Sequence, residues 1–141
     1  MRDEQFTIPL SRVVDEFQFE KLYTAENYED ILVTCADVNR PGLQIVGFFD
    51  YFDNHRIQIL GKVELTYLAQ FPYEKRYNLL KPLFSKDVPA VIITRAMQAG
   101  PEIIELAREF NVTLLRTEQS TSSLMSALIS YLNVQIAPRI T

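Results

Sequence analysis

Four side chains between positions 39 and 56 combine amide, guanidinium and imidazole groups, which are the groups that bind phosphate and carboxylate anions. Asn39 and Arg40 stand directly before Pro41-Gly42, and His55 and Arg56 follow a second turn. Because proline and glycine restrict the backbone, the Arg40 guanidinium is expected to have a defined direction. One interpretation is an anion site that binds a phosphorylated metabolite or a nucleotide through these residues.

A structural interpretation of the same residues stays open. Arg40 would then form a salt bridge that holds two loops together, and His55 would be a solvated loop residue. Asn39, Arg40, His55 and Arg56 are therefore candidates for contact either with an anion or with an interface.

Motifs that carry catalysis are missing from the sequence. Gly61-Lys62-Val63 has neither the first glycine nor the hydroxyl of a nucleotide phosphate loop, and the four glycines are too isolated for a dinucleotide fingerprint. One histidine and one cysteine cannot form a typical zinc site. We expect no catalytic, cofactor-binding or metal-ligating residue in this chain.

Composition limits the class of protein. A chain of 141 residues with 48% hydrophobic residues is expected to fold as a single domain, residues 1–141. A net charge of −4 argues against a nucleic-acid partner, which would require a basic face. The longest uncharged segment, Gln119–Pro138, contains five serines, so no membrane span is expected. One cysteine and no secretion signal predict a cytoplasmic protein.

Hydrophobic periodicity predicts an α/β fold around these residues. Ile31–Ala36 has β-branched and apolar residues at both odd and even positions, which predicts a strand buried on both faces and ended by a turn at Asp37–Gly42. Ser11 is expected to cap a short helix. The other predicted strands are Phe19–Tyr23, Arg56–Gly61, Val88–Thr94 and Val112–Thr117, and the other predicted helices begin at Lys62, Tyr73, Gly100 and Thr121.

Two of these predictions concern tertiary structure. The order strand, helix, strand from Val88 to Thr117 predicts a parallel βαβ unit, with Asn111 ending the helix. The last helix, about Thr121 to Ile136, has a wide apolar face and no charge. We expect that helix to pack on another subunit or on further sequence beyond Thr141.

Three ordered segments resemble a known family. Asp37–Gly42 (DVNRPG), Gly47–Phe52 (GFFDYF) and Arg56–Leu65 (RIQILGKVEL) are similar to the N-terminal domain of bacterial HPr kinase/phosphorylase. Val88–Arg95 and Val112–Arg116 resemble two strands of the same domain. The resemblance covers nearly the whole chain.

The resemblance implies a three-layer α/β fold with a mostly parallel or mixed central sheet and flanking helices, similar to the N-terminal domains of Mur ligases. It implies a cytosolic, homohexameric parent enzyme that phosphorylates a serine of HPr with ATP or pyrophosphate and Mg²⁺ and also removes that phosphate. In that family the catalytic groups lie in a C-terminal kinase domain, which is absent from these 141 residues.

The function expected from the resemblance is a non-catalytic regulatory or assembly domain in carbon catabolite regulation. Its partners would be the kinase domain, other subunits and, indirectly, HPr. The alternative is a stand-alone sensor that binds a phosphorylated metabolite or nucleotide through Arg40, His55 and Arg56.

Overall fold

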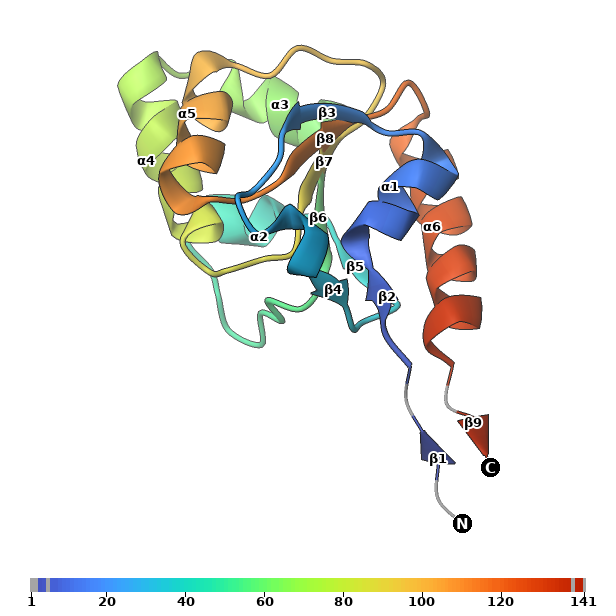
Figure 1. Ribbon diagram of the computed structural model, residues 1–141. Helices are drawn as coiled ribbons and strands as arrows, with labels where there is room; N and C mark the ends of the chain where they lie inside the picture. The colour runs from blue at the N-terminus through green and yellow to red at the C-terminus, as the bar shows by residue number, and fades with distance from the viewer. Residues whose placement is uncertain (1–2, 5, 138, 141) are drawn as a thin grey trace.

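A five-stranded mixed sheet forms the middle layer of the computed structural model, which describes residues 3–4, 6–137 and 139–140 (Figure 1). The strand order is β3-β8-β7-β6-β5. Strands β5 to β8 are parallel, and β3 is antiparallel to β8. These strands are β3 (Glu20–Tyr23), β5 (Val38–Asn39), β6 (Ile57–Leu60), β7 (Val91–Ile93) and β8 (Leu114–Arg116).

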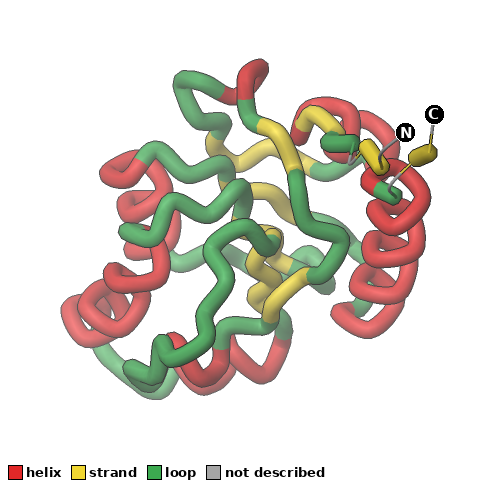
Figure 2. The backbone as a smooth tube through the Cα atoms, turned by 90° about the horizontal axis from the view of Figure 1, so that it is seen from below, coloured by secondary structure: helices red, strands yellow, loops and turns green. Residues whose placement is uncertain are grey.

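Helices cover both faces of this sheet, as Figures 1 and 2 show. One face carries α2 (Gly42–Ile45), α3 (Lys62–Leu68), α4 (Tyr73–Phe84) and α5 (Pro101–Phe110). The other face carries α1 (Leu10–Phe17) and α6 (Thr121–Ile136). The three-layer α/β fold expected from the sequence is confirmed.

Short elements complete the structure. A 3₁₀ turn, Tyr28–Asp30, comes directly before β4 (Leu32–Val33), which pairs antiparallel with the distant β2 (Ile8–Pro9) outside the main sheet. Near the termini, β1 (Asp3–Glu4) pairs antiparallel with β9 (Arg139–Ile140), so the two ends of the chain lie side by side (Figure 1).

The predicted βαβ unit is confirmed. Strands β7 and β8 are parallel, with α5 between them. Gly100 is the N-cap of α5 and Pro101 its first residue, where a missing N–H removes no helical hydrogen bond. Asn111 ends α5 in the left-handed conformation at φ 57°, which asparagine tolerates better than most residues.

Two local predictions are wrong. Of the segment Ile31–Ala36, only Leu32–Val33 is a strand, it lies outside the main sheet, and half of the Leu32 surface (50%) is exposed. Strand β5 instead forms within the segment predicted as a turn, where Val38 and Asn39 pair with Ile57 and Gln58. Val33 is fully buried in the core from the two-residue strand β4, so this apolar segment packs inside the protein without joining the main sheet.

The second wrong prediction is the helix cap at Ser11. Ser11 lies inside helix α1, which begins at Leu10, with Pro9 at the N-cap and no side-chain cap. Pro9 already has a φ of −58°, which is compatible with entry into a helix.

The bounds of the last helix are confirmed. An external partner was expected because its wide apolar face would otherwise be uncovered, and the structure, which describes all of this helix, does not show such an uncovered face. Leu124, Leu128, Leu132 and Ile136 of α6 are all buried in the core of the same chain, together with residues of α1 and β2. The apolar face of α6 is therefore covered internally.

Helices α4 and α5 are joined by two tyrosine–carboxylate hydrogen bonds. Tyr73 and Tyr77 donate to Glu105 and Glu109, respectively. The hydrogen bond to Glu105, with smaller contributions from burial and nearby negative charge, raises the pKa of Tyr73 to about 12.

This pKa predicts a distinct alkaline titration. Because the folded-state pKa of Tyr73 lies above its ordinary value of 10.0, its contribution to stability is complete below pH 10 and is lost as the pH rises towards about 12. Tyr73→Phe is expected to remove the phenolate absorbance step near pH 12, and Glu105→Gln to shift that step to lower pH. An unchanged titration curve in Tyr73→Phe would contradict this assignment.

Candidate functional site

The carboxyl edge of the parallel strands gathers polar residues from four segments. Arg40, Gly61 and Thr94 are the first residues after β5, β6 and β7, respectively. Thr121 is the first residue of α6, which follows β8. Carboxyl edges are where α/β sheets usually place ligand-binding groups, so this edge is a candidate site.

Glu64 is the centre of this cluster. One of its carboxylate oxygens, Oε1, accepts the backbone N–H of Gly61 at 2.6 Å, which caps the start of α3. Its carboxylate also pairs with the Arg40 guanidinium, with an Nη2–Oε2 distance of 3.0 Å. Only 6% of the Glu64 side-chain surface is exposed, against 36% for Arg40. Arg40 therefore forms a salt bridge, as its structural interpretation expected, but the bridge joins the segment after β5 to helix α3 rather than two loops.

Two threonine hydroxyls fill the adjoining space. Thr94 Oγ1 and Thr121 Oγ1 are 2.7 Å apart and both side chains are buried. A Cβ atom added to Gly61 would lie 2.4 Å from Thr121 Oγ1 and 3.1 Å from the Arg40 guanidinium. Glycine is required here by close packing, and the chain's own side chains occupy this part of the edge.

The importance of Glu64, Thr94 and Thr121 was not predicted. A signal for Glu64 exists in the sequence, since a glutamate three residues after a potential N-cap is the pattern of a capping interaction. The two threonines carry no such signal, because their contact joins residues 27 positions apart.

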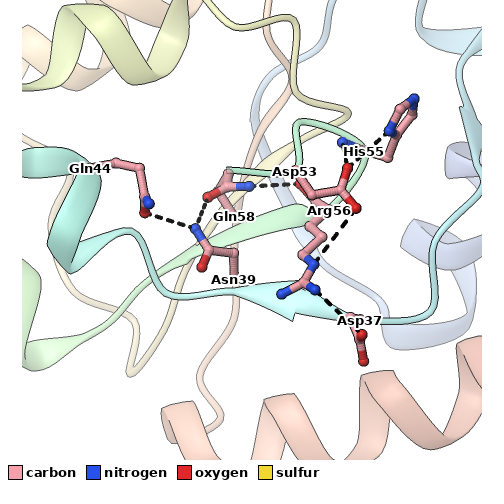
Figure 3. A network of polar contacts seen from close by, with 7 residues as sticks. All are labelled: Asp37, Asn39, Gln44, Asp53, His55, Arg56 and Gln58. Atoms are coloured by element: carbon pink, nitrogen blue, oxygen red, sulfur yellow. Dashed lines mark hydrogen bonds and ion pairs between the residues drawn. The ribbon is translucent and has the colours of Figure 1, made fainter. Parts of the chain in front are cut away.

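Asn39 belongs to a separate amide network on the edge strand (Figure 3). Its Nδ2 group donates to Gln58 Oε1 at 2.7 Å and to Gln44 Oε1 at 3.1 Å. The amide groups of Gln58 and Gln44 then donate to backbone carbonyls of Arg56 and Phe48. This network ties β5 to β6 and α2.

His55 and Arg56 lie before β6, at the amino edge of the sheet. Asp53 Oδ1 is 2.9 Å from His55 Nδ1 and also accepts the His55 backbone N–H at 2.9 Å. The Arg56 guanidinium contacts Asp37 at 3.6 Å and Asp53 at 3.9 Å (Figure 3). The backbone hydrogen bond from His55 lowers the pKa of Asp53, although partial burial opposes the shift.

The four candidate residues therefore divide among three places. Arg40 contacts Glu64 at the carboxyl edge, Asn39 lies in the amide network, and His55 and Arg56 contact Asp53 at the amino edge. The arrangement does not bring Arg40 together with His55 and Arg56, and both guanidinium groups are already paired with carboxylates. No observation favours the phosphorylated-ligand sensor over the domain role.

Among the described residues, no three histidine, cysteine, aspartate or glutamate side chains are grouped so that they could hold a metal ion. Within the same residues, every helix is too short or too polar to cross a membrane.

Comparison with known proteins identifies relatives along almost the whole chain. Residues 8–132 match the family described as HPr Serine kinase N terminus. HPr kinase/phosphorylase of Lachnoclostridium phytofermentans is 37% identical over 136 residues, covering 96% of this chain and 44% of the relative. The Streptococcus thermophilus enzyme is 36% identical over 133 residues, covering 94% and 43%. The chain thus spans less than half the length of these relatives.

One solved structure supports the fold. The crystal structure of the CBS and DRTGG domains of the regulatory region of Clostridium perfringens pyrophosphatase, complexed with the activator diadenosine tetraphosphate, aligns with a TM-score of 0.55. The alignment covers 89% of this chain and 46% of that chain at 21% identity, so the likeness concerns the fold. The sequence match over residues 8–132, which runs from β2 to α6, shows that the chain belongs to the HPr serine kinase N-terminal family.

Proposed function

We propose that this chain is a non-catalytic regulatory and assembly domain of an HPr kinase/phosphorylase. The observation that carries the proposal is the coverage of its relatives, in which 95% of this chain corresponds to only 44% of the Caldanaerobacter subterraneus enzyme. Phosphorylation of a serine of HPr with ATP or pyrophosphate and Mg²⁺, and its reversal, would then depend on the C-terminal kinase domain. The proposed compartment is the cytoplasm.

The carboxyl edge supports a non-catalytic role. Arg40, which could have bound a phosphate, is neutralised by the buried Glu64 carboxylate. Glu64 is itself occupied by the Gly61 N–H, and the neighbouring threonine hydroxyls contact each other. These groups hold four segments of the fold together, which is a structural task.

An exposed apolar segment supports the assembly role. Leu43 and Val46 of the α2 region and Phe48 and Tyr51 of the following loop are all largely exposed. Four large apolar side chains within nine positions are typical of a contact surface rather than of a solvated loop. Its partner would be the kinase domain or another subunit of a homo-oligomer, which we propose to be a hexamer.

The experiment that tests the proposal uses two measurements on one sample of the purified chain. Incubated with HPr, Mg²⁺ and either ATP or pyrophosphate, the chain is expected to transfer no phosphate, while the complete Streptococcus thermophilus relative serves as the positive control. Light scattering is expected to give a mass above the 16.3 kDa of one chain. Phosphorylated HPr would overturn the non-catalytic role, and a strictly monomeric mass would overturn self-assembly.

A further inference from the structure

A cavity of about 270 Å³ opens at the amino edge of the parallel sheet, away from the Arg40–Glu64 pair. The segments that lead into β6, β7 and β8 form most of its wall. Its size is near the lower limit for ligand pockets, about 300 Å³, so it fits a small molecule. The polar lining residues are Asn27, Thr34, Asn54, His55, Asp87 and Asn111.

Hydrogen bonds within the protein fix the amide side chains of this wall. Asn111 Oδ1 accepts from Tyr23 and from the Glu26 backbone, at 3.0 and 2.8 Å, and its Nδ2 group donates to Asn27 Oδ1 at 3.3 Å. Asn54 Nδ2 donates to the Lys86 carbonyl at 2.9 Å. These bonds use both ends of the Asn111 amide but one end each of the Asn27 and Asn54 amides, so they orient the other ends of Asn27 and Asn54 and reduce the entropy lost when a ligand binds.

The His55 imidazole is oriented in the same way. Asp53 contacts its Nδ1 atom at 2.9 Å, and Figure 3 shows the ring projecting from Asp53 on the side away from Arg56. His55 lines the cavity, and its second ring nitrogen, Nε2, is not used by the contact with Asp53.

Several polar groups of this wall have no partner among the residues that the structure describes. They are the Asn27 amide nitrogen, the Asn54 amide oxygen, His55 Nε2 and the Asp87 carboxylate. The set mixes a donor with several acceptors. Hydroxyl groups, which donate and accept at the same atom, complement such a set.

The charged residues at the cavity disfavour an anionic ligand. The cavity lining contains no lysine or arginine, and Asp87 brings an unpaired carboxylate to it. The nearest guanidinium of the amino edge, Arg56, contacts Asp37 and Asp53 instead. A phosphate group would meet negative charge without a cation to neutralise it.

Apolar side chains supply the rest of the wall. Leu32 is half exposed at the cavity, and Pro89 and Phe110 are partly buried beside it. We propose that this cavity binds a neutral, polyhydroxylated molecule of monosaccharide size, with its C–H surface on these side chains and its hydroxyls on Asn27, His55 and Asp87.

Amide chemical shifts of the purified chain, titrated with glucose, myo-inositol and glucose 6-phosphate, test the proposal. Glucose or myo-inositol is expected to give saturable shift changes centred on Asn27, His55 and Asp87, and glucose 6-phosphate is expected to bind more weakly than glucose. The proposal is overturned if neither neutral polyol gives saturable changes at these residues, or if glucose 6-phosphate binds more tightly than glucose.

A matched pair of variants separates cavity binding from a general effect of charge. Asp87 has a φ of 61°, and asparagine tolerates this left-handed conformation, so Asp87→Asn is expected to fold. Loss of a charge-assisted hydrogen bond is expected to weaken polyol binding about tenfold. Asp50→Asn, which removes an exposed carboxylate that does not line the cavity, is expected to leave the affinity unchanged. Equal affinities in the two variants would overturn the assignment.

Discussion

Replacement of Glu64 by alanine is expected to lower the free energy of unfolding by about 3 kcal/mol. The substitution removes the acceptor of the buried Gly61 N–H and the partner of Arg40 in one step. Arg40 can reach water because it is partly exposed, so the larger share of the loss is expected from the uncapped N–H and the vacated space. Urea unfolding followed by circular dichroism measures the change.

A matched control is available at the start of the next helix. Glu74 occupies the first turn of α4 but is exposed, so Glu74→Ala is expected to change stability by less than about 1 kcal/mol. Glu64→Gln retains an oxygen for the Gly61 N–H and should lie between wild type and Glu64→Ala. Equal effects of Glu64→Ala and Glu74→Ala would show that the Glu64 contacts contribute nothing beyond those of a surface residue.

Gly61→Ala is expected to destabilise the domain by about 1–3 kcal/mol, the usual effect of overpacking a buried site. The new methyl group would lie 2.4 Å from Thr121 Oγ1, a short side chain held by its contact with Thr94. Thermal unfolding of the variant measures the effect.

Two comparisons isolate the steric cause. Gly42→Ala adds the same methyl group where nothing lies within 4 Å, so it is expected to be nearly neutral. In a Thr121→Ala background, the obstructing oxygen is gone and Gly61→Ala should cost less than in wild type. If the cost is the same in both backgrounds, the clash with Thr121 is not the cause.

The parts of the fold that could be predicted are those that depend on local sequence. Asn111 ends α5 and Gly100-Pro101 begins it because these residues favour their backbone conformations without help from distant contacts. Helix α6 was predicted with correct bounds because a continuous helical pattern runs from about Thr121 and Pro138 stops it. The alternation of apolar and polar residues also predicted β6, although all four of its residues are buried.

The parts that could not be predicted depend on partners distant in sequence. Ile31–Ala36 has the composition of a central strand, but Val38–Asn39 occupies the place beside β6, with only two paired residues to reveal it. The same limit applies to the candidate site. Proximity along the chain suggested that Arg40 and Arg56 act together. Arg40 follows β5 and Arg56 precedes β6, so they lie at opposite ends of two adjacent parallel strands, where each is paired with a different carboxylate.

The amide network around Gln58 bears on how the edge strand finds its alignment during folding. Gln58 is completely buried on a central strand, and its Oε1 atom is bonded to Asn39 directly across the β5–β6 pair. A slip of β5 by one residue would place the Val38 or Arg40 position opposite Gln58 and leave a buried amide oxygen without a donor. Val38 is the one buried apolar residue of this two-residue strand, so apolar packing by itself gives little further specification of the register. The Asn39–Gln58 pair therefore favours one alignment of the edge strand β5 against β6.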